Sequence, residues 1–253
     1  MPSATPQHDV GYPQIATLGV SGLLVQFGDT LNEPVNRAAL ALRARLEKES
    51  WDGIEETSTS LSSVFVRFDP LHVTHANLRR RLENLLRDQD WYAAALPTGR
   101  RHWHIPCSFG GADGPQLCEA AELAHQGEAA AIADIAAHPV QVLTIGFAPG
   151  QPYMGSLPAA WDIPRQTGLT AKVPGGALVV AIRQLIIFAA DAPTGWRHIG
   201  QTAFRCFRPE ADDPFALRPG DQVSFDPVTA ETLAALRNND ASGNGGAKME
   251  MLA

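Results

Sequence analysis

Residues 140–155 read VQVLTIGFAPGQPYMG, an apolar run that passes directly into a loop of glycine, proline and aromatic residues. The run, 140–145, predicts a buried strand. In the loop, proline fixes φ and removes an amide donor, and glycine lets backbone N–H groups come close to a ligand. Such a loop can direct several donors at one anionic or carbonyl oxygen, although a tight corner without a ligand explains the same residues equally well.

Three more irregular corners follow this loop, at 172–176 (KVPGG), 181–184 (AIRQ) and 191–200 (DAPTGWRHIG). Short β-rich runs lie between and around them. We expect strands at 103–107, 140–145, 177–182, 185–190, 204–207 and 222–225, and helices at 115–125 and 128–137. Short strands joined by turns rich in glycine and proline predict a closed or nearly closed β-barrel.

The first half of the chain has a different pattern, which predicts a small α+β domain at residues 15–96. Expected strands lie at 21–27, 54–60, 63–68 and 91–95, and expected helices at 32–46 and 74–86. Asn32 and Thr74 are suitable helix caps, and apolar residues recur after them at helical spacing. The order β-α-β-β-α-β is typical of the ferredoxin-like fold. The turn-rich segment 97–101 (PTGRR) is the expected domain boundary.

Composition excludes several classes of protein. The 253 residues carry a formal charge of −7, which argues against a surface for nucleic acid or an anionic membrane. Arg79, Arg80 and Arg81 are the exception, and their helical pattern favours a solvated face. No apolar segment reaches the ~20 residues of a membrane span, and residues 1–14 do not resemble a signal peptide, so we expect a flexible N-terminus and a cytoplasmic protein. Residues 229–253 are polar and glycine-rich, and we expect a disordered tail after one short helix.

Metal chemistry is not expected from the sequence. The three cysteines, Cys107, Cys118 and Cys206, have no CxxC spacing, which argues against a metal site or a disulfide framework. His102 and His104 alternate with Trp103 and would share one face of a strand, but a metal would need a third ligand from elsewhere. The usual nucleotide and hydrolase motifs are also missing from the sequence.

The order and spacing of the four corners resemble the family that includes allophanate hydrolase subunit 1, the B subunit of bacterial 5-oxoprolinase and the sporulation-kinase inhibitor of bacilli. The resemblance covers roughly residues 15–228. It rests on the GFxPGxxYxG pattern, the basic residue before Val173-Pro174, Gln184, and the corner Pro193-x-Gly195-Trp196. It implies that residues 97–228 form a cyclophilin-like barrel, a mostly-β fold that strand periodicity alone does not name.

The candidate catalytic residues are Lys172, Gln184 and Asp191. Lys172 can supply a cation for a carboxylate, a phosphoryl group or an amide oxygen, Gln184 can recognise an amide, and Asp191 can act as a base or orient a cation. Each residue also has a purely structural explanation. Lys172 can be an ordinary solvated surface charge, Gln184 can hold the neighbouring loop in place, and Asp191 can belong to a simple turn. Candidate substrate- or phosphate-binding residues are Gly146, Phe147, Pro149, Gly150, Tyr153, Arg165, Pro174, Gly175 and Trp196. Tyr153 and Trp196 also suit cavity walls, and Phe147 suits a core position.

This chain departs from the family pattern around Gln184. Family members commonly have glycines where this chain has Ile182 and Arg183, and a threonine-glycine pair at 185–186. They also commonly have an aromatic residue at Gln151 and an acidic one at Gln116. Because non-glycine residues resist positive φ, the turn before Gln184 must be reshaped or strained, which leaves the substrate open.

The resemblance implies a subunit of an ATP-dependent amidohydrolase, 5-oxoprolinase, which opens 5-oxoproline to glutamate. ATP with Mg²⁺ would act at the level of the complex. The implied partners are a biotin-dependent carboxyltransferase-like subunit 2, which completes the site, and a lactam-utilisation-type third subunit. Two alternatives remain: a biotin-dependent carboxyltransferase subunit acting on urea or allophanate, and a non-enzymatic inhibitor of a histidine kinase.

Overall fold

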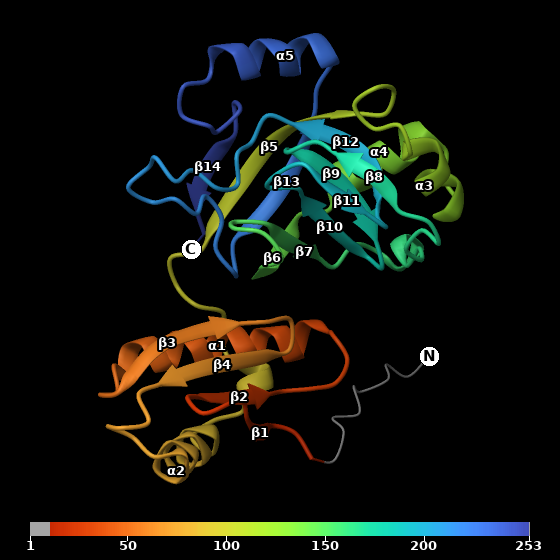
Figure 1. The fold of residues 1–253 in the computed structure, drawn as a ribbon. Coiled ribbons are helices and arrows are strands. Elements are labelled where there is room, and N and C mark those ends of the chain that lie inside the picture. Colours follow the sequence, from red (N-terminus) through yellow and green to blue (C-terminus); the bar gives the residue numbers. More distant parts are fainter. Residues whose placement is uncertain (1–10, 253) are drawn as a thin grey trace. The chain divides into compact units, whose positions relative to one another are not determined.

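A computed structural model describes residues 11–252, which form two compact units divided between Pro97 and Thr98 (Figure 1). Each unit has its own hydrophobic core. The N-terminal segment expected to be flexible comprises residues 1–14, and residues 1–10 of it lie outside the described residues. The first strand begins at Gln14.

Residues 11–97 contain one four-stranded antiparallel sheet in the order β1-β2-β4-β3. The elements are β1 (Gln14–Thr17), β2 (Gly22–Gln26), α1 (Glu33–Glu49), β3 (Ile54–Thr59), β4 (Ser63–Phe68) and α2 (His75–Leu86). Both predicted caps are confirmed, because Asn32 Oδ1 accepts a hydrogen bond from the Val35 amide at 2.9 Å and Thr74 Oγ1 accepts one from Asn77 at 3.2 Å. Apolar residues of the sheet and of both helices form a single core.

The predicted closing strand at 91–95 is wrong. Trp91–Ala93 is a 3₁₀ helix, and Asp90 caps it by accepting a hydrogen bond from the Tyr92 amide at 3.0 Å. Both aromatic side chains are anchored to backbone carbonyls, Trp91 to Leu86 and Tyr92 to Phe27. The sheet keeps the ferredoxin-like strand order, because β1 pairs with β2 where the closing strand was expected.

Within residues 98–252, seven strands close into a mixed barrel in the order β12-β9-β10-β7-β6-β13-β5. They are β5 (Arg101–Phe109), β6 (Val140–Ile145), β7 (Pro152–Gly155), β9 (Ala177–Ala181), β10 (Gln184–Ile187), β12 (Arg197–Thr202) and β13 (Gln222–Pro227). The barrel closes because β5 pairs in parallel with β13 on one edge and antiparallel with β12 on the other. A ribbon of β8 (Thr170–Val173) and β11 (Ala192–Thr194) lies outside this ring in the sheet pairing.

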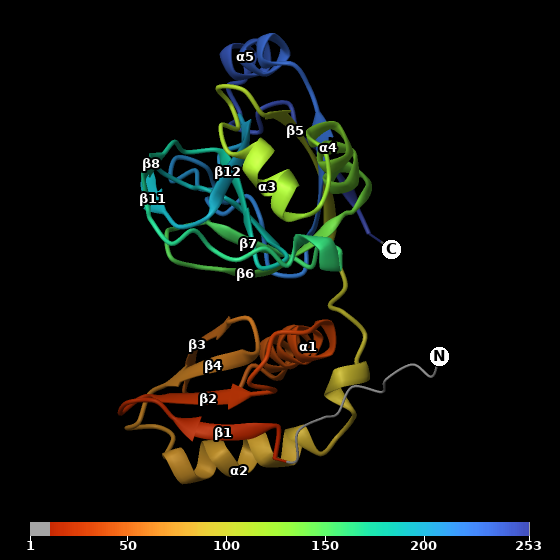
Figure 2. The same ribbon diagram turned by 90° about the vertical axis from the view of Figure 1, so that its right-hand side faces the viewer.

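Two helices, α3 (Leu117–Leu123) and α4 (Glu128–Ala137), lie side by side on the barrel (Figure 2). Their apolar side chains, including Leu117 and Ile135, join the barrel core. The predicted strand at 204–207 is wrong, since the backbone there makes only an isolated bridge between Phe207 and Phe215. The predicted fold class, an α+β unit followed by a mostly-β barrel, is confirmed. A short 3₁₀ helix, Ala159–Trp161, precedes β8.

The short helix expected at the start of residues 229–253 is confirmed, but the disordered tail expected after it is wrong for the described residues. Helix α5 (Ala230–Asn239) begins at the Thr229 cap and buries Leu233, and β14 (Lys248–Met251) then pairs with β5. Polar residues of the intervening loop make local hydrogen bonds, including those from the Ser242 and Gly245 amides to Asp240. The barrel unit therefore continues beyond residue 228. Strand β12 pairs with residues 107–109 of β5, and β14 pairs with residues 101–104 of the same strand.

Candidate functional site

Two cavities on the barrel unit contain residues that the sequence singled out. The first, here called the Tyr153 cavity, has a volume of about 320 Å³. It is lined by Phe147, Gln151, Tyr153, Arg165, Gln166, Leu169, Ile186, Phe188, Pro193, Thr194, Gly195 and Trp196. The second, the His198 cavity, has a volume of about 650 Å³ and includes Pro174, Gly175, Gly176, His198, Gln201, Arg205, Arg237 and Asp240 in its lining.

Aromatic side chains and one cation define the Tyr153 cavity. The rings of Tyr153 and Trp196 meet edge to face, with centroids 6.2 Å apart. The Arg165 guanidinium lies 5.3 Å from the Trp196 ring centroid, a distance suited to a cation–π contact. Within residues 11–252, Arg165 makes no ion pair with an acidic side chain, so its charge is available to an anion.

Side-chain amides form the polar part of the Tyr153 cavity. Gln166 donates to the Trp196 carbonyl at 2.8 Å and accepts from Gln116 at 2.7 Å, while Gln116 accepts from the His198 amide. The orientation of Gln166 is therefore fixed by a chain of hydrogen bonds. Gln151 is 1% exposed, and its Oε1 accepts a hydrogen bond from the Ala189 amide at 3.4 Å. Two of the positions where this chain departs from the family pattern, Gln116 and Gln151, thus supply or orient these amides.

The loop at 146–151 is held by close backbone contacts. Gly150 has φ +73°, and a Cβ there would lie 2.6 Å from the Cys206 carbonyl oxygen, so glycine is required by both conformation and space. The Gly146 amide donates to the Gln151 carbonyl, and Pro149 is exposed between them. Phe147 also has positive φ and is 77% exposed, which corrects the expectation of a core position and puts its ring at the cavity rim.

The predicted catalytic residues Lys172 and Asp191 form an exposed ion pair, with Nζ and Oδ2 2.7 Å apart. The second carboxylate oxygen of Asp191 accepts the Gly175 amide at 2.9 Å. Contact with Lys172, followed by the Gly175 hydrogen bond, lowers the pKa of Asp191. Neither residue lines the Tyr153 cavity, because Lys172 alternates along β8 with the buried Val173. The pair instead adjoins the His198 cavity through Gly175.

The third predicted catalytic residue, Gln184, is buried at the start of β10 and pairs with Gly155 of β7. It lies on the same strand face as Ile186 and Tyr153 without lining the cavity. The turn before it keeps positive φ at both Ile182 and Arg183, so this turn is strained and not reshaped. Hydrogen bonds from both backbone amides, to Ile163 and Trp161, hold this turn.

The four corners therefore do not converge on one cleft. Phe147, Tyr153, Arg165 and Trp196 share the Tyr153 cavity, whereas Pro174 and Gly175 line the His198 cavity. Sequence reasoning missed Gln151 and Gln166 as lining residues, and it missed His198 altogether. His198 is 6% exposed, its Nε2 has no hydrogen-bond partner among residues 11–252, and burial lowers its pKa. The sequence signal that could have identified His198 was its position in the irregular corner at residues 191–200.

In the part of the chain that the structure describes, no helix combines the length and apolar character needed to cross a bilayer. Among the described residues, Cys107 and Cys206 are buried free thiols and Cys118 is an exposed one.

Comparisons with known proteins agree with this fold. A family model described as "Carboxyltransferase domain, subdomain C and D" matches residues 13–217. The B subunit of the 5-oxoprolinase of Bacillus subtilis (strain 168) is 31% identical over 220 residues, covering 84% of this chain and 91% of the relative.

Solved structures show the same architecture. The protein TTHA0988 is 28% identical with a TM-score of 0.70, and the match covers 83% of this chain and 40% of that protein, so the present chain spans about two fifths of its length. The urea amidolyase of K. lactis shares the fold, with a TM-score of 0.72 and 17% sequence identity. That match covers 94% of this chain and 16% of the urea amidolyase chain. The chain is a member of the family defined by subdomains C and D of the carboxyltransferase domain, with B subunits of 5-oxoprolinase among its homologues.

Proposed function

We propose that this chain is the B subunit of a 5-oxoprolinase complex, which uses ATP to open the lactam ring of 5-oxoproline and form glutamate. Its relationship to the B subunit of Bacillus subtilis supports the assignment to such a complex. The observation that carries the substrate proposal is the Tyr153 cavity, where Arg165, which has no acidic partner in the described part of the chain, lies beside aromatic walls and oriented amides.

The chemistry of 5-oxoproline matches this cavity. The substrate is a small flat ring with one carboxylate and one cyclic amide. Arg165 can bind the carboxylate with a bidentate pair of charge-assisted hydrogen bonds, and the ring can pack against the aromatic wall that Tyr153 and Trp196 form together. Gln151 can recognise the lactam amide, since its side chain carries both a donor and an acceptor, and the oxygen of Gln166 can accept from the lactam N–H while its nitrogen remains bonded to Trp196 and Thr170. The volume of about 320 Å³ suits a ligand of this size.

ATP removes the chemical obstacle in this reaction. An amide carbonyl is a poor electrophile, and transfer of a phosphoryl group to its oxygen turns that oxygen into part of a leaving group before water attacks the carbon. Lys172 Nζ and the Gly175 amide already converge on one carboxylate, that of Asp191. We propose that in the complex these donors bind a phosphate group of ATP beside the His198 cavity, with Asp191 orienting Lys172 and Gln184 supporting the adjoining strand.

The remaining parts of the site belong to partners in this proposal. A carboxyltransferase-like subunit 2 would complete the catalytic groups, a lactam-utilisation-type subunit would contribute to turnover, and ATP with Mg²⁺ would bind to the assembled complex. Use of ATP places the proposed complex in the cytoplasm.

Coexpression with the two partner subunits tests the function. The purified complex is expected to release glutamate only when both ATP and 5-oxoproline are present, and omission of this chain should abolish the release. Absence of turnover in a stable complex would contradict the proposal. Biotin-dependent carboxylation of urea would then favour the carboxyltransferase alternative, and tight binding to a histidine-kinase dimerisation helix would favour the inhibitor.

Replacing Lys172 with alanine is expected to abolish glutamate release by the complex while changing the free energy of unfolding by less than about 0.5 kcal/mol. The side chain is 68% exposed, and a surface ion pair contributes little to stability. Initial rates and urea unfolding measure the two effects. Lys48→Ala, at an exposed lysine on α1, is the matched control and should retain full activity. Unimpaired turnover by K172A would remove Lys172 from the site.

A further inference from the structure

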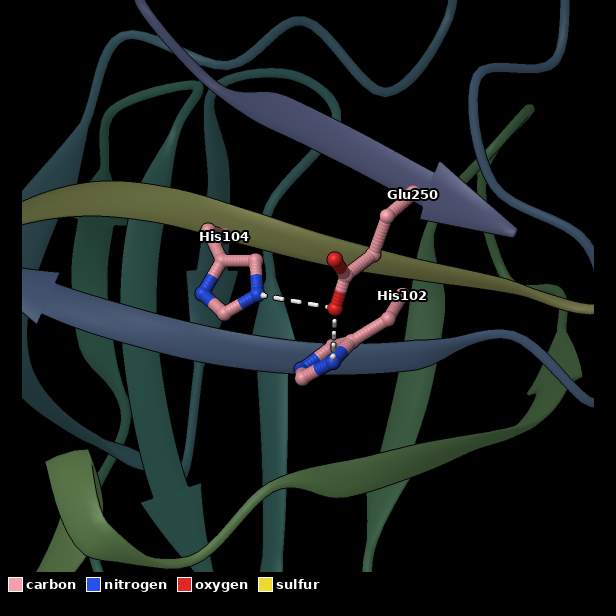
Figure 3. A group of neighbouring side chains, drawn as sticks. All are labelled: His102, His104 and Glu250. Atoms are coloured by element: carbon pink, nitrogen blue, oxygen red, sulfur yellow. Dashed lines mark ion pairs between the residues drawn. The ribbon is translucent and has the colours of Figure 1, made fainter. Parts of the chain in front are cut away.

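A cluster of histidine and carboxylate side chains lies on the barrel unit, outside both cavities (Figure 3). His102 and His104 project from the same face of β5, while the intervening Trp103 joins the core. Strand β14 lies next to β5 with Glu250 directly opposite His102. The third side chain that the sequence pattern lacked therefore comes from the segment expected to be disordered.

The three side chains present their ligand atoms at metal-binding spacing. One nitrogen from each histidine and one oxygen of Glu250 all lie within 4.8 Å of one another. Glu250 Oε1 is 3.5 Å from His102 Nδ1 and 3.7 Å from His104 Nε2. Ligands of a tetrahedral zinc ion lie about 3.3 Å apart, so small side-chain movements suffice to bind one.

Polar side chains on β13 lie next to both histidine rings. The Ser224 hydroxyl is 2.8 Å from His102 Nε2, and the serine is 7% exposed. Asp226 Oδ1 is 3.9 Å from His104 Nδ1. Metal-binding histidines usually donate the N–H of the other ring nitrogen to such a partner, which fixes the tautomer and directs the free lone pair at the metal. Here Ser224 lies within hydrogen-bond distance of the ring nitrogen of His102 that Glu250 does not approach, and Asp226 lies 3.9 Å from the corresponding nitrogen of His104.

We propose that His102 Nδ1, His104 Nε2 and the Glu250 carboxylate bind a divalent transition-metal ion of the zinc class. Two imidazoles and one carboxylate are a common ligand set for zinc, and three protein ligands leave a position for water or another small ligand. Glu250 and Asp226 contribute two negative charges beside the histidines, against the single positive charge of Lys248, which lies opposite His104 on β14. This site is independent of the proposed lactam chemistry.

The metal would also fasten the C-terminal strand to the barrel. Glu250 belongs to β14, a four-residue strand whose residues are exposed and whose only strand partner among the described residues is β5. A metal bridge between Glu250 and two residues of β5 would add a side-chain link to that backbone pairing. Binding should therefore stabilise the fold of residues 229–252 more than that of the N-terminal unit.

Zinc titration of the full chain, free of any affinity tag, tests the site. Calorimetry is expected to give one tight site per chain, and Co²⁺ should give visible absorption bands typical of nitrogen and oxygen coordination. Loss of a partner that only orients a ligand already costs about 10- to 100-fold in metal affinity, so His104→Ala and Glu250→Gln, which alter ligands themselves, should weaken zinc binding by at least about 100-fold and at least about 10-fold respectively. These two side chains are 36% and 66% exposed, so the variants should fold, which circular dichroism can verify.

His138→Ala is the matched control, because His138 also pairs with a carboxylate, Asp134, but is not part of a three-ligand group in the described chain. Its zinc affinity should equal that of the unaltered protein. Zinc should also slow proteolysis within 229–252 in the unaltered protein and not in E250Q. Zinc binding that is absent, or equally strong in the His104 and Glu250 variants, would overturn the proposal.

Discussion

Replacing Arg165 with alanine is expected to lower kcat/KM of the assembled complex for 5-oxoproline by about 10- to 100-fold, mainly through a higher KM. A hydrogen bond to a charged group contributes about 1.5–3 kcal/mol, and each 1.4 kcal/mol is a factor of ten. Because Arg165 would hold the carboxylate and not the reacting amide, the contact exists in the ground state as well as in the transition state, so KM carries the change. Steady-state kinetics of the complex measure it.

Two further variants separate binding from structure. Arg165→Lys keeps the positive charge but lacks the planar guanidinium that can donate two parallel hydrogen bonds to a carboxylate. Its affinity for 5-oxoproline should therefore lie between those of R165A and the unaltered protein. Arg218→Ala removes an exposed arginine that is paired with Asp213 and lies outside the Tyr153 cavity, and it should leave KM unchanged. Calorimetric binding of 5-oxoproline to the full chain provides a readout that does not depend on turnover. An unchanged KM in R165A would exclude Arg165 as the carboxylate ligand.

The sequence predicted part of this site because the relevant residues flank short strands that the barrel must bring together. Tyr153 on β7 and Trp196 after β11 share a cavity, as their positions at corners suggested. It could not predict that Lys172 lies elsewhere. Along β8, Lys172 alternates with Val173, which is buried in the same cluster as Trp196. Which of these two residues faces the core depends on how the β8–β11 ribbon packs on the barrel, and the local sequence does not determine that packing.

Errors in the fold prediction share a physical cause, which is that long-range pairing overrides local pattern. The run at 91–95 has the aromatic content of a strand, but hydrogen bonds to Leu86 and Phe27 fix its two aromatic side chains. The tail at 229–252 buries little by itself and becomes ordered because β5 has a free edge at residues 101–104. The alternation at 102–104 predicted that both histidines share a face, while Glu250 was beyond reach of any local argument.

Replacing Asp221 with alanine is expected to lower the free energy of unfolding of the barrel unit by about 3–5 kcal/mol. Asp221 is 3% exposed and accepts hydrogen bonds from the backbone amides of Arg101 and Arg218, at 3.1 and 2.9 Å. The Arg101 guanidinium, on a side chain only 12% exposed, binds the same carboxylate. Removing the carboxylate leaves a buried cation and two amides without their partner, which costs far more than the loss of a surface ion pair.

The position of this pair explains why the effect should be so large. Arg101 begins β5 and Asp221 immediately precedes β13, so the contact fixes the register of the parallel pairing through which the barrel closes. Urea unfolding followed by tryptophan fluorescence measures the change. Asp213→Ala, which breaks the exposed pair with Arg218, is the matched control and should cost no more than about 1 kcal/mol. If D221A lowered the free energy of unfolding by a similarly small amount, the Arg101 guanidinium would have become hydrated without opening the barrel. Strand pairing alone would then fix the register of β5 and β13.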